Sequence, residues 1–393
     1  MRIPASGDLH LTFCLNAFPS PRPDDLGQYF NQVLLPIRDL SGCQDNLGWG
    51  LWLDRRSAAR LADPVRSAAF CAGLARHQFY LFTLNGFPYG AFHDSRIKEK
   101  VFYPDWTSPE RLHYTLELAR VLGTCSPPDQ LGSISTVPLG ERAAFHCDHK
   151  RRQAAGMLVR AVAELDSLRK TRGITVVLAL EPEPGAALET GAEASDFIEK
   201  VLLPEASVTD AGFDDQTVLR HIGICVDLAH AAVMEESVMD LAAECHRRNI
   251  RIAKVHISAA VSFRPTRSAL EQMHLLADPV YLHQLRARLP DGGIAAWRDL
   301  PDALRDPRLL ECDQARIHFH VPLTWQGSGD LRPVAGIPPP EIVQAVVTAG
   351  CRHFEVETYT YAVLPPELRP QSPISAAAAE LRTAANHLKG YYH

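Results

Sequence analysis

The stretch VLALEPEPG, residues 177–185, is an apolar run that ends in two glutamates, Glu181 and Glu183. A short run rich in valine and leucine is typical of a strand that is buried on both faces of a parallel sheet. An ionised carboxylate in such surroundings costs several kcal/mol unless an opposite charge compensates it. We therefore expect a positive partner at the end of this strand.

Short apolar runs recur along the whole chain, with amphipathic stretches between them. Nine runs are candidate strands, and they begin at Leu11, Gly48, Tyr80, Gly132, Thr175, Ile222, Ile252, Arg316 and His353. This alternation, without a glycine-rich phosphate loop after the first run, predicts a closed (β/α)8 TIM barrel rather than an open doubly wound sheet. Such a barrel has eight strands, so we expect RIHFHVPL, residues 316–323, to lie outside it. The amphipathic stretch 151–173 predicts a helix that stops at Gly173.

The composition predicts one large domain with a small-molecule partner. With 393 residues, of which 46% are hydrophobic, the chain can bury a large core. We expect a single barrel domain over residues 1–393, with loop insertions at about 89–110 and 261–330. A net charge of -6 disfavours binding to nucleic acid or to an anionic membrane surface.

Cysteine usage and the N-terminal residues bear on the compartment. Nine cysteines without a CxxC pair argue against a disulfide framework and against a zinc ribbon. The N-terminus lacks the apolar core of a signal peptide, and no window reaches the roughly 20 apolar residues of a membrane span. We therefore expect a soluble, cytoplasmic protein.

Polar side chains that suit a metal ion follow several of the apolar runs. They are Asn16, Asn85, Glu181, Glu183, Asp227, His230, His256, His318, His320, Glu355 and Glu357. Because the carboxyl ends of barrel strands meet at one mouth, we expect these side chains to lie close together. Carboxylates and imidazoles from separate strands bind divalent cations such as Zn2+, Mn2+, Mg2+ or Co2+. The alternative is that each carboxylate pairs with an arginine or caps the next helix.

The loop TLNGFPYGAFH, residues 83–93, follows the third run and is rich in aromatic residues. Its glycines and proline favour tight turns. Asn85, Phe87, Tyr89 and His93 are therefore candidates for a wall over an apolar part of a substrate. The alternative is a packed loop without a ligand.

Four of these strand ends carry a resemblance to a known superfamily. LALEPEPG, CVDLAH, KVHIS and EVETYT resemble the Glu, Asp, His and Glu strand ends of the xylose isomerase-like TIM barrels, which include ketose 3-epimerases, inosose dehydratases and endonuclease IV. Over nearly the whole chain, LTFCLN, TLNGFPYGAFH, VFYPDWTSPERLHYT, SISTVPLG, HFHVPL and EVETYTY resemble the bacterial metabolite traffic protein EboE family.

The superfamily resemblance implies one divalent ion with four ligands, which are Glu181, Asp227, His256 and Glu357. Glu181 and Glu357 would also be catalytic, removing a proton from the carbon beside a carbonyl and returning it on the other face. Glu355 lies on the same face of the last strand as Glu357, and we choose Glu357 because it is nearer the exit. The predicted substrate contacts are His230, His320, Asn85, Phe87, Tyr89 and Asn16.

The resemblance leaves three functions open. The first is an isomerase or epimerase of a sugar, polyol or related hydroxy-carbonyl metabolite in a secondary-metabolite pathway. The second is a multi-zinc hydrolase of the endonuclease IV-like branch, with a second metal at His318, His320 and His230. The third is a non-catalytic metabolite-binding escort protein that works with a UbiA-like membrane prenyltransferase and other Ebo proteins.

Overall fold

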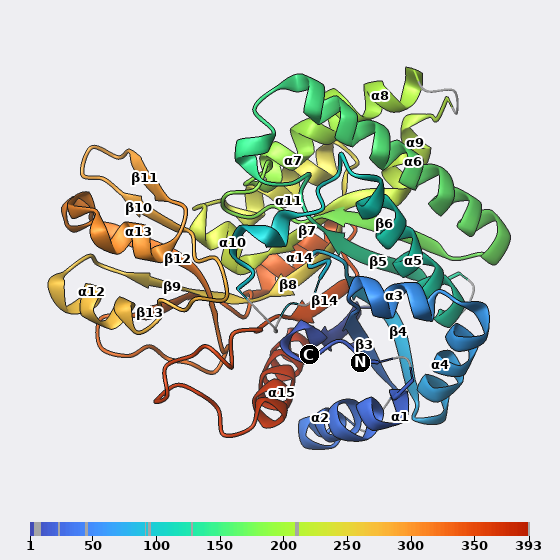
Figure 1. The fold of residues 1–393 in the computed structure, drawn as a ribbon, viewed down its shortest axis with the longest axis horizontal. Helices are drawn as coiled ribbons and strands as arrows, with labels where there is room; N and C mark the ends of the chain where they lie inside the picture. Colours follow the sequence, from blue (N-terminus) through green and yellow to red (C-terminus); the bar gives the residue numbers. More distant parts are fainter. Residues whose placement is uncertain are drawn as a thin grey trace.

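Eight parallel strands form a nearly closed barrel in the computed structural model, which describes residues 1–3, 9–22, 24–43, 46–90, 92, 96–126, 129–208 and 212–391 (Figure 1). The barrel strands are β2 (Leu9–Phe13), β3 (Leu47–Trp52), β4 (Phe79–Asn85), β5 (Leu131–Thr136), β6 (Thr175–Leu180), β7 (Ile222–Asp227), β8 (Arg251–Ile257) and β14 (His353–Val356). The short β1 (Arg2–Ile3) pairs antiparallel with β2. The predicted (β/α)8 barrel is confirmed.

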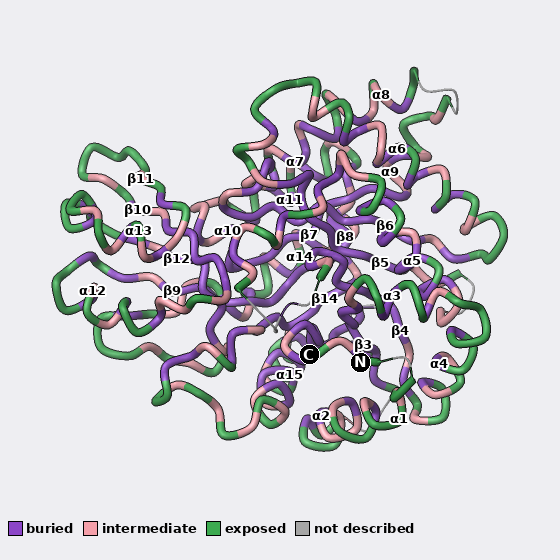
Figure 2. Tube along the Cα trace, viewed as in Figure 1, coloured by how far each residue is buried: buried purple, intermediate pink, exposed green. Residues whose placement is uncertain are grey.

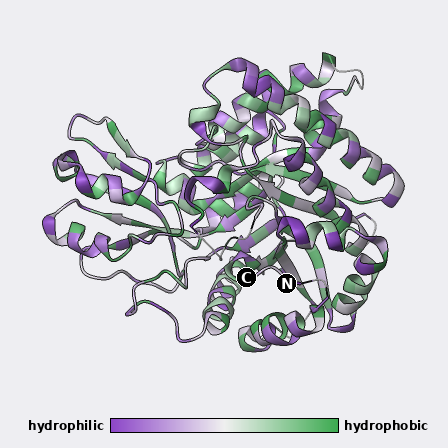
Figure 3. Ribbon diagram, viewed as in Figure 1, coloured by the Kyte–Doolittle hydropathy of each residue, from purple (hydrophilic) through white to green (hydrophobic). Residues whose placement is uncertain are grey.

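The barrel closes between β2 and β3, which are the first and last parallel strands of the sheet. A single parallel bridge joins Cys14 to Gly50, and the Gly50 amide donates to Thr12 Oγ1 at 3.0 Å. The strands are almost wholly buried, whereas hydrophobic and hydrophilic residues alternate along the surrounding helices (Figures 2 and 3). This is the arrangement that apolar runs alternating with amphipathic stretches predict.

Helices connect the barrel strands on the outside. They are α1 (Leu26–Tyr29), α2 (Leu35–Ser41), α3 (Arg55–Leu61), α4 (Pro64–Arg76), α5 (Pro109–Cys125), α6 (Asp148–Arg172), α7 (Gly191–Phe197), α8 (Leu203–Val208), α9 (Asp215–His221), α10 (Leu228–Val233), α11 (Val238–Arg247), α14 (Pro340–Thr348) and α15 (Pro373–Gly390). Short 3-10 or π turns occur at Leu15–Ala17, Phe30–Leu34, Lys98–Phe102, Arg142–Ala144, Ile198–Leu202 and Pro307–Glu311.

Local sequence explains where these helices begin and end. The α5 helix starts at Pro109, and Ser108 caps it by accepting from the Glu110 amide at 3.2 Å. The α6 helix ends at Gly173, whose φ of 74° is the left-handed conformation that glycine adopts at low cost. The predicted helix stop is therefore confirmed.

A second, five-stranded antiparallel sheet lies between β8 and α14 in sequence and projects from the side of the barrel (Figure 1). Its strands are β9 (Ala259–Phe263), β10 (Leu285–Arg288), β11 (Ile294–Trp297), β12 (Gln314–Val321) and β13 (Arg332–Ala335), and its helices are α12 (Arg267–His274) and α13 (Leu300–Arg305). The run RIHFHVPL falls largely on β12, which pairs with β9 and β10 and not with the barrel. Its predicted place outside the barrel is confirmed.

One expectation from the cysteines is corrected. Cys71 on α4 and Cys125 on α5 form a disulfide with Cα atoms 5.0 Å apart. The two cysteines are 54 residues apart in sequence, and only the packing of α4 against α5 brings them together. None of the described helices has both the length and the apolar character needed to cross a membrane.

Candidate metal centre

Four side chains from four neighbouring barrel strands converge at the mouth of the barrel. Glu181 and Glu357 directly follow β6 and β14, Asp227 ends β7, and His256 lies near the end of β8. One ligand atom from each residue lies within 4.8 Å of the others, and all four residues are buried. We call this set the carboxylate cluster. Sequence reasoning named the same four residues, and parallel register places their strand ends together.

Asp227 has its two oxygens in different surroundings. Asp227 is the N-cap of α10, so its Oδ1 accepts from the His230 amide at 2.8 Å, and it also accepts from Ser258 Oγ at 2.8 Å. Its Oδ2 lies 3.7 Å from His256 Nδ1 and has no hydrogen-bond partner among the described residues. Burial alone would raise the pKa of Asp227, but His230, His320 and His256 lower it well below its usual value.

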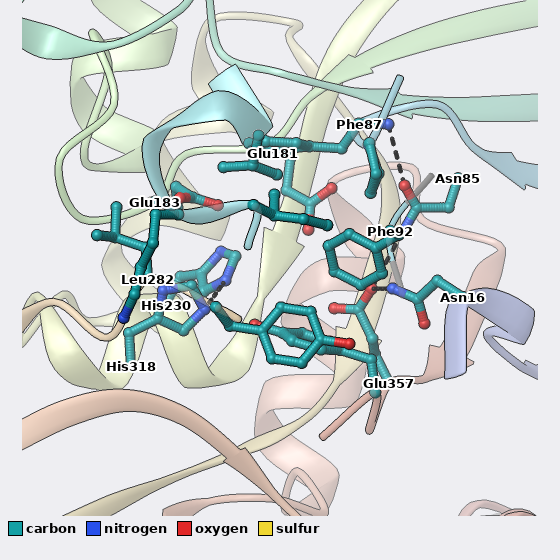
Figure 4. A pocket seen from close by; sticks show the side chains of 16 residues that line it. Asn16, Asn85, Phe87, Phe92, Glu181, Glu183, His230, Leu282, His318 and Glu357 are labelled. Atoms are coloured by element: carbon teal, nitrogen blue, oxygen red, sulfur yellow. Dashed lines mark hydrogen bonds between the residues drawn. The ribbon is translucent and has the colours of Figure 1, made fainter. Parts of the chain in front are cut away.

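Glu357 is oriented by two asparagines from the first strands of the barrel. Asn16 and Asn85 donate to Glu357 Oε1 at 2.8 and 3.0 Å, and Figure 4 shows both side chains reaching this carboxylate. The Phe87 amide in turn holds Asn85 Oδ1 at 3.0 Å. Glu357 Oε2 remains 3.3 Å from His256 Nδ1. Both asparagines therefore position a candidate ligand.

His256 contacts carboxylates through both ring nitrogens. Its Nδ1 lies 2.9 Å from Glu181 Oε1, and its Nε2 lies 3.1 Å from Glu355 Oε2. Burial by itself would lower the pKa of His256, but the carboxylates Glu357 and Glu181 raise it well above its usual value. Glu355, whose pKa burial would raise, is brought to about 2 by Lys254 and His256. Glu357 therefore lies in the cluster, whereas Glu355 lies behind the imidazole and pairs with Lys254.

The carboxylate cluster fits a divalent cation on its own chemistry. Glu181 Oε2 and Asp227 Oδ2 are buried atoms without a hydrogen-bond partner among the described residues, a state that is costly for a carboxylate. Three carboxylates and one imidazole form a donor set for Mg2+, Mn2+, Co2+ or Zn2+. Burial and the neighbouring Glu181 also raise the pKa of Glu183 well above its usual value, as expected where negative charge is crowded.

Three histidines form a second buried cluster beside the first. His318 and His320 lie two residues apart on β12 and so share one face of the strand, and His230 lies in the first turn of α10. Their ring nitrogens lie within 4.8 Å of one another, with the Nε2 atoms of His230 and His318 only 3.0 Å apart. We call this set the imidazole cluster. Asp227 lies between the two clusters, since its Oδ1 is 3.8 Å from His230 Nε2.

Hydrogen bonds assign the tautomers of the imidazole cluster. His230 Nδ1 faces the Pro182 carbonyl at 3.0 Å, His320 Nδ1 faces the Glu357 carbonyl at 3.1 Å, and His318 Nδ1 faces Gln284 Oε1 at 2.7 Å. Because these oxygens can only accept, each Nδ1 donates. In the neutral rings the three Nε2 atoms therefore carry lone pairs. His320 Nε2 has no hydrogen-bond partner among the described residues, so the cluster offers imidazole nitrogens that suit a cation.

A pocket opens above both clusters, and Figure 4 shows Glu181 and Glu357 directed into it from different elements. Its polar side contains both glutamates with His230 and His318. Its apolar side includes Phe92, Tyr281 and Tyr359, whose ring centroids lie 5.1 to 5.2 Å apart. The remaining lining residues are Asn16, Asn85, Phe87, Pro88, Ile97, Lys98, Val101, Glu183 and Leu282.

The structure does not bring every predicted residue to this pocket. Tyr89 packs edge-on against Tyr114 and beneath Arg55, and it lines a different surface hollow. His93 lies outside the described residues. His320 is fully buried behind the pocket, in the imidazole cluster. Cys225, interpreted from sequence as a core residue, lies with its Sγ 3.8 Å from His256 Nδ1, and burial raises its pKa to about 12.

Several pocket residues were missed by sequence reasoning. Glu183, which the sequence places among the polar strand ends without a ligand or substrate role, is 6% exposed, lines the pocket and accepts from Gln284 Nε2 at 3.3 Å. Its spacing from Glu181 was the available signal. Tyr281 and Leu282 come from the inserted segment before β10, and no local pattern marks them. Tyr359 lies in the quoted EVETYT motif, so its position two residues after Glu357 could have suggested it.

Solved structures with the same architecture were compared with the chain. A protein from Anabaena variabilis ATCC 29413, assigned provisionally as a sugar phosphate isomerase/epimerase, is 12% identical, with a TM-score of 0.53 over 98% of this chain and 99% of that chain. The two chains share the (β/α)8 barrel fold. At this identity the similarity concerns the fold alone.

Two further structures are similar at lower scores. A xylose isomerase domain protein from Alicyclobacillus acidocaldarius is 16% identical, with a TM-score of 0.47 over 97% of this chain and 99% of that chain. The IOLI protein with a bound zinc atom is 12% identical, with a TM-score of 0.48 over 98% and 99%. No protein-family model matches the chain, and no curated protein matches its sequence. Membership of the EboE family therefore stays a prediction.

Proposed function

We propose that this xylose isomerase-like barrel is a divalent-metal-dependent isomerase or epimerase. Its substrate would be a sugar, a polyol or a related hydroxy-carbonyl metabolite. The observation that carries the proposal is the placement of Glu181 and Glu357, which belong to one buried cluster and line one pocket from the ends of β6 and β14. The isomerase/epimerase assignment of the Anabaena protein with this fold agrees with it.

The residues present would hold the cation and move a proton. Glu181, Asp227, His256 and Glu357 would be its ligands. When bound, a divalent cation supplies a Lewis acid that polarises a carbonyl group and stabilises negative charge on its oxygen. Glu181 would take a proton from the carbon beside the carbonyl, and Glu357 would return one to the opposite face. Asn16 and Asn85 would keep Glu357 aimed at that carbon.

The far side of the pocket bears on the rest of the substrate. Phe92, Tyr281 and Tyr359 present rings there, which suits a substrate with an apolar portion. The EboE resemblance extends the proposal to a secondary-metabolite pathway in the cytoplasm, with a UbiA-like membrane prenyltransferase as a partner. In an escort protein the same pocket would hold the metabolite without turnover.

Exchange of the substrate proton with solvent tests the proposal. Protein loaded with Mn2+ or Co2+ is incubated in deuterium oxide with a panel of ketoses, ketose phosphates and inososes, and deuterium beside the carbonyl is measured by mass spectrometry. We expect incorporation that Glu181→Gln and Glu357→Gln abolish and that Glu236→Gln retains, because Glu236 accepts from the backbone amides of Gly191 and Ala192 on α7, away from the pocket. A panel member that binds with metal but never exchanges would favour the escort function instead.

A second candidate function rests on the imidazole cluster. Three Nε2 lone pairs that converge beside the carboxylate cluster favour a second, borderline cation such as Zn2+, held by His230, His318 and His320. Two neighbouring cations with Asp227 between them are typical of hydrolases that cleave phosphate esters or related bonds. This is the multi-zinc hydrolase alternative.

Metal content and hydrolysis separate the two candidates. The hydrolase candidate predicts at least two zinc ions per chain and cleavage of bis(p-nitrophenyl) phosphate that His318→Ala removes. One metal per chain, with deuterium exchange that persists in His318→Ala, would contradict it and support the isomerase.

A further inference from the structure

A buried ion pair lies one layer deeper in the barrel than the carboxylate cluster. Lys254 precedes His256 by two residues on β8, and Glu355 precedes Glu357 by two residues on β14, so both side chains point into the barrel like the candidate ligands. Lys254 Nζ donates to Glu355 Oε2, and both side chains are 0% exposed. Such a pair is weak evidence for stability, since well-packed apolar residues often serve equally well.

Glu355 also accepts a hydrogen bond from the ring of His256. The register pairs Glu355 with His256 across β14 and β8, and His256 Nε2 lies 3.1 Å from Glu355 Oε2. A carboxylate only accepts, so Nε2 carries the hydrogen and donates. The other nitrogen, Nδ1, faces the candidate ligands Glu181 and Glu357 at 2.9 and 3.3 Å, so it also donates to a carboxylate, and a cation bound there would replace that proton.

The neighbouring strand leaves room for this carboxylate. A Cβ atom built at Gly50 on β3 would lie 1.6 Å from Glu355 Oε1 and 2.9 Å from Thr12 Cγ2. Any side chain at position 50 would therefore displace Glu355. Side chains normally fill the interior of a TIM barrel, and branched apolar ones dominate there. The glycine at position 50 thus leaves a space that the Glu355 carboxylate fills beside Thr12.

We propose that Glu355 is a positioning residue that holds His256 as the Nε2–H tautomer, with Lys254 as its counter-charge and Gly50 as the source of its space. This leaves His256 Nδ1 as the nitrogen directed at the cation. The inference rests on the metal centre of the proposed function and adds residues that touch neither cation nor substrate. Hydrogen-bond partners of this kind typically change metal affinity by about 10-fold to 100-fold.

Metal affinity and the histidine tautomer together test the inference. The dissociation constant of Mn2+ is measured by electron paramagnetic resonance, and the tautomer of His256 is read from nitrogen-15 spectra of the Zn2+-loaded protein, assigned with His256→Gln. We expect Glu355→Gln and Gly50→Ala each to weaken Mn2+ binding by about 10-fold to 100-fold. Gly50→Ala should also lose the Nε2–H signature, whereas the amide oxygen of Glu355→Gln can still accept from Nε2–H without the negative charge. Glu355→Asp should retain part of the affinity.

Two further variants keep the test decisive. If the single variants fail to fold, the double replacement Lys254→Met with Glu355→Leu removes the pair without leaving a buried charge, and we expect it to fold with the same loss of affinity. Glu236→Gln is the matched control and should bind Mn2+ like the wild type. Folded variants with wild-type affinity and an unchanged tautomer would overturn the inference alone. A wild-type protein whose Mn2+ binding is independent of Glu181 would overturn the proposed metal centre and, with it, this inference.

Discussion

The carboxylate cluster and the imidazole cluster share one mouth but are built in opposite ways. Strand ends of the barrel supply the first, which carries three carboxylates, and the inserted β12 supplies two of the three histidines of the second. The negative charge of the first cluster requires a positive partner, whereas the second presents the Nε2 lone pairs of its imidazole rings. Hard oxygen donors favour Mg2+ or Mn2+, and imidazole nitrogens favour Zn2+. The barrel and the inserted sheet therefore present two different donor sets side by side.

The largest effect is expected from removing one carboxylate, a change that should affect the carboxylate cluster and not the imidazole cluster. Glu181→Gln should abolish turnover, because an amide neither takes a proton nor neutralises a cation, and a general base supplies about 100-fold to 10,000-fold in rate. Mn2+ binding should weaken with it, while Zn2+ at the imidazole cluster should persist. Isothermal titration with each metal, together with the deuterium exchange assay, checks this. Glu183 is unsuitable as a control because it lines the pocket, so Glu236→Gln is used. Loss of both metals in Glu181→Gln would mean that the two clusters form one site.

The reverse experiment removes one imidazole. His318→Ala should lower Zn2+ affinity by about 100-fold, since it deletes one ligand of three, while Mn2+ binding at the carboxylate cluster stays within a factor of about three. Competition with a chromogenic chelator measures the Zn2+ affinity. His274→Ala, an exposed histidine on α12 of the same inserted segment, is the matched control. Equal Zn2+ affinity in the two variants would argue that the histidines are only packed against one another.

A buried carboxyl group at the junction between the barrel and the inserted sheet makes the stability of the protein depend on pH. Glu380 on α15 accepts from the Leu323 amide after β12 and from Thr358 after β14, both at 2.8 Å, and burial raises its pKa to about 7. The folded state therefore holds a proton that the unfolded state loses from about pH 4.5 upward. Stability from this group is present below about pH 4.5 and is lost as the pH rises to about 7, by roughly 3 kcal/mol in total.

Replacement of that carboxyl group tests the junction. The free energy of unfolding is measured with urea between pH 4.5 and 7. That of the wild type should fall over this range, whereas that of Glu380→Gln should fall less, because the amide does not ionise. Glu311→Gln, an exposed position, should follow the wild type at every pH. Parallel pH profiles for wild type and Glu380→Gln would show that Glu380 ionises normally in the folded protein.

The smallest effect concerns the amides that orient Glu357. Asn85→Leu removes a donor to Glu357 Oε1 but leaves Asn16 in place, so Mn2+ affinity should fall only about 10-fold. The imidazole cluster should keep its Zn2+ affinity, since neither asparagine contacts it. Asn386→Leu on the exposed face of α15 is the control. A defect as large as that of Glu181→Gln would make Asn85 a ligand in its own right.

Much of the fold follows from local chemistry in the sequence. Apolar runs such as residues 175–180 form buried strands because only a sealed, hydrogen-bonded strand accommodates them, and Gly173 ends α6 because it adopts a positive φ without strain. Parallel strands then place their carboxyl ends at one mouth, so the positions of Glu181, Asp227, His256 and Glu357 along the chain already predicted that they would meet. The roles of these residues stay predictions.

Tertiary structure alone decided the contacts between residues that are far apart in sequence. His230 and His318 are 88 residues apart, Lys254 and Glu355 are 101 apart, and Cys71 and Cys125 are 54 apart. No local pattern encodes these pairs, because each depends on which helix or strand packs beside which. Tyr281 and Leu282 reach the pocket for the same reason, from an inserted segment whose path is set by packing. The sequence by itself determined the barrel and its ring of polar strand ends. Packing determined the second cluster, the pocket wall and the carboxylate that holds His256.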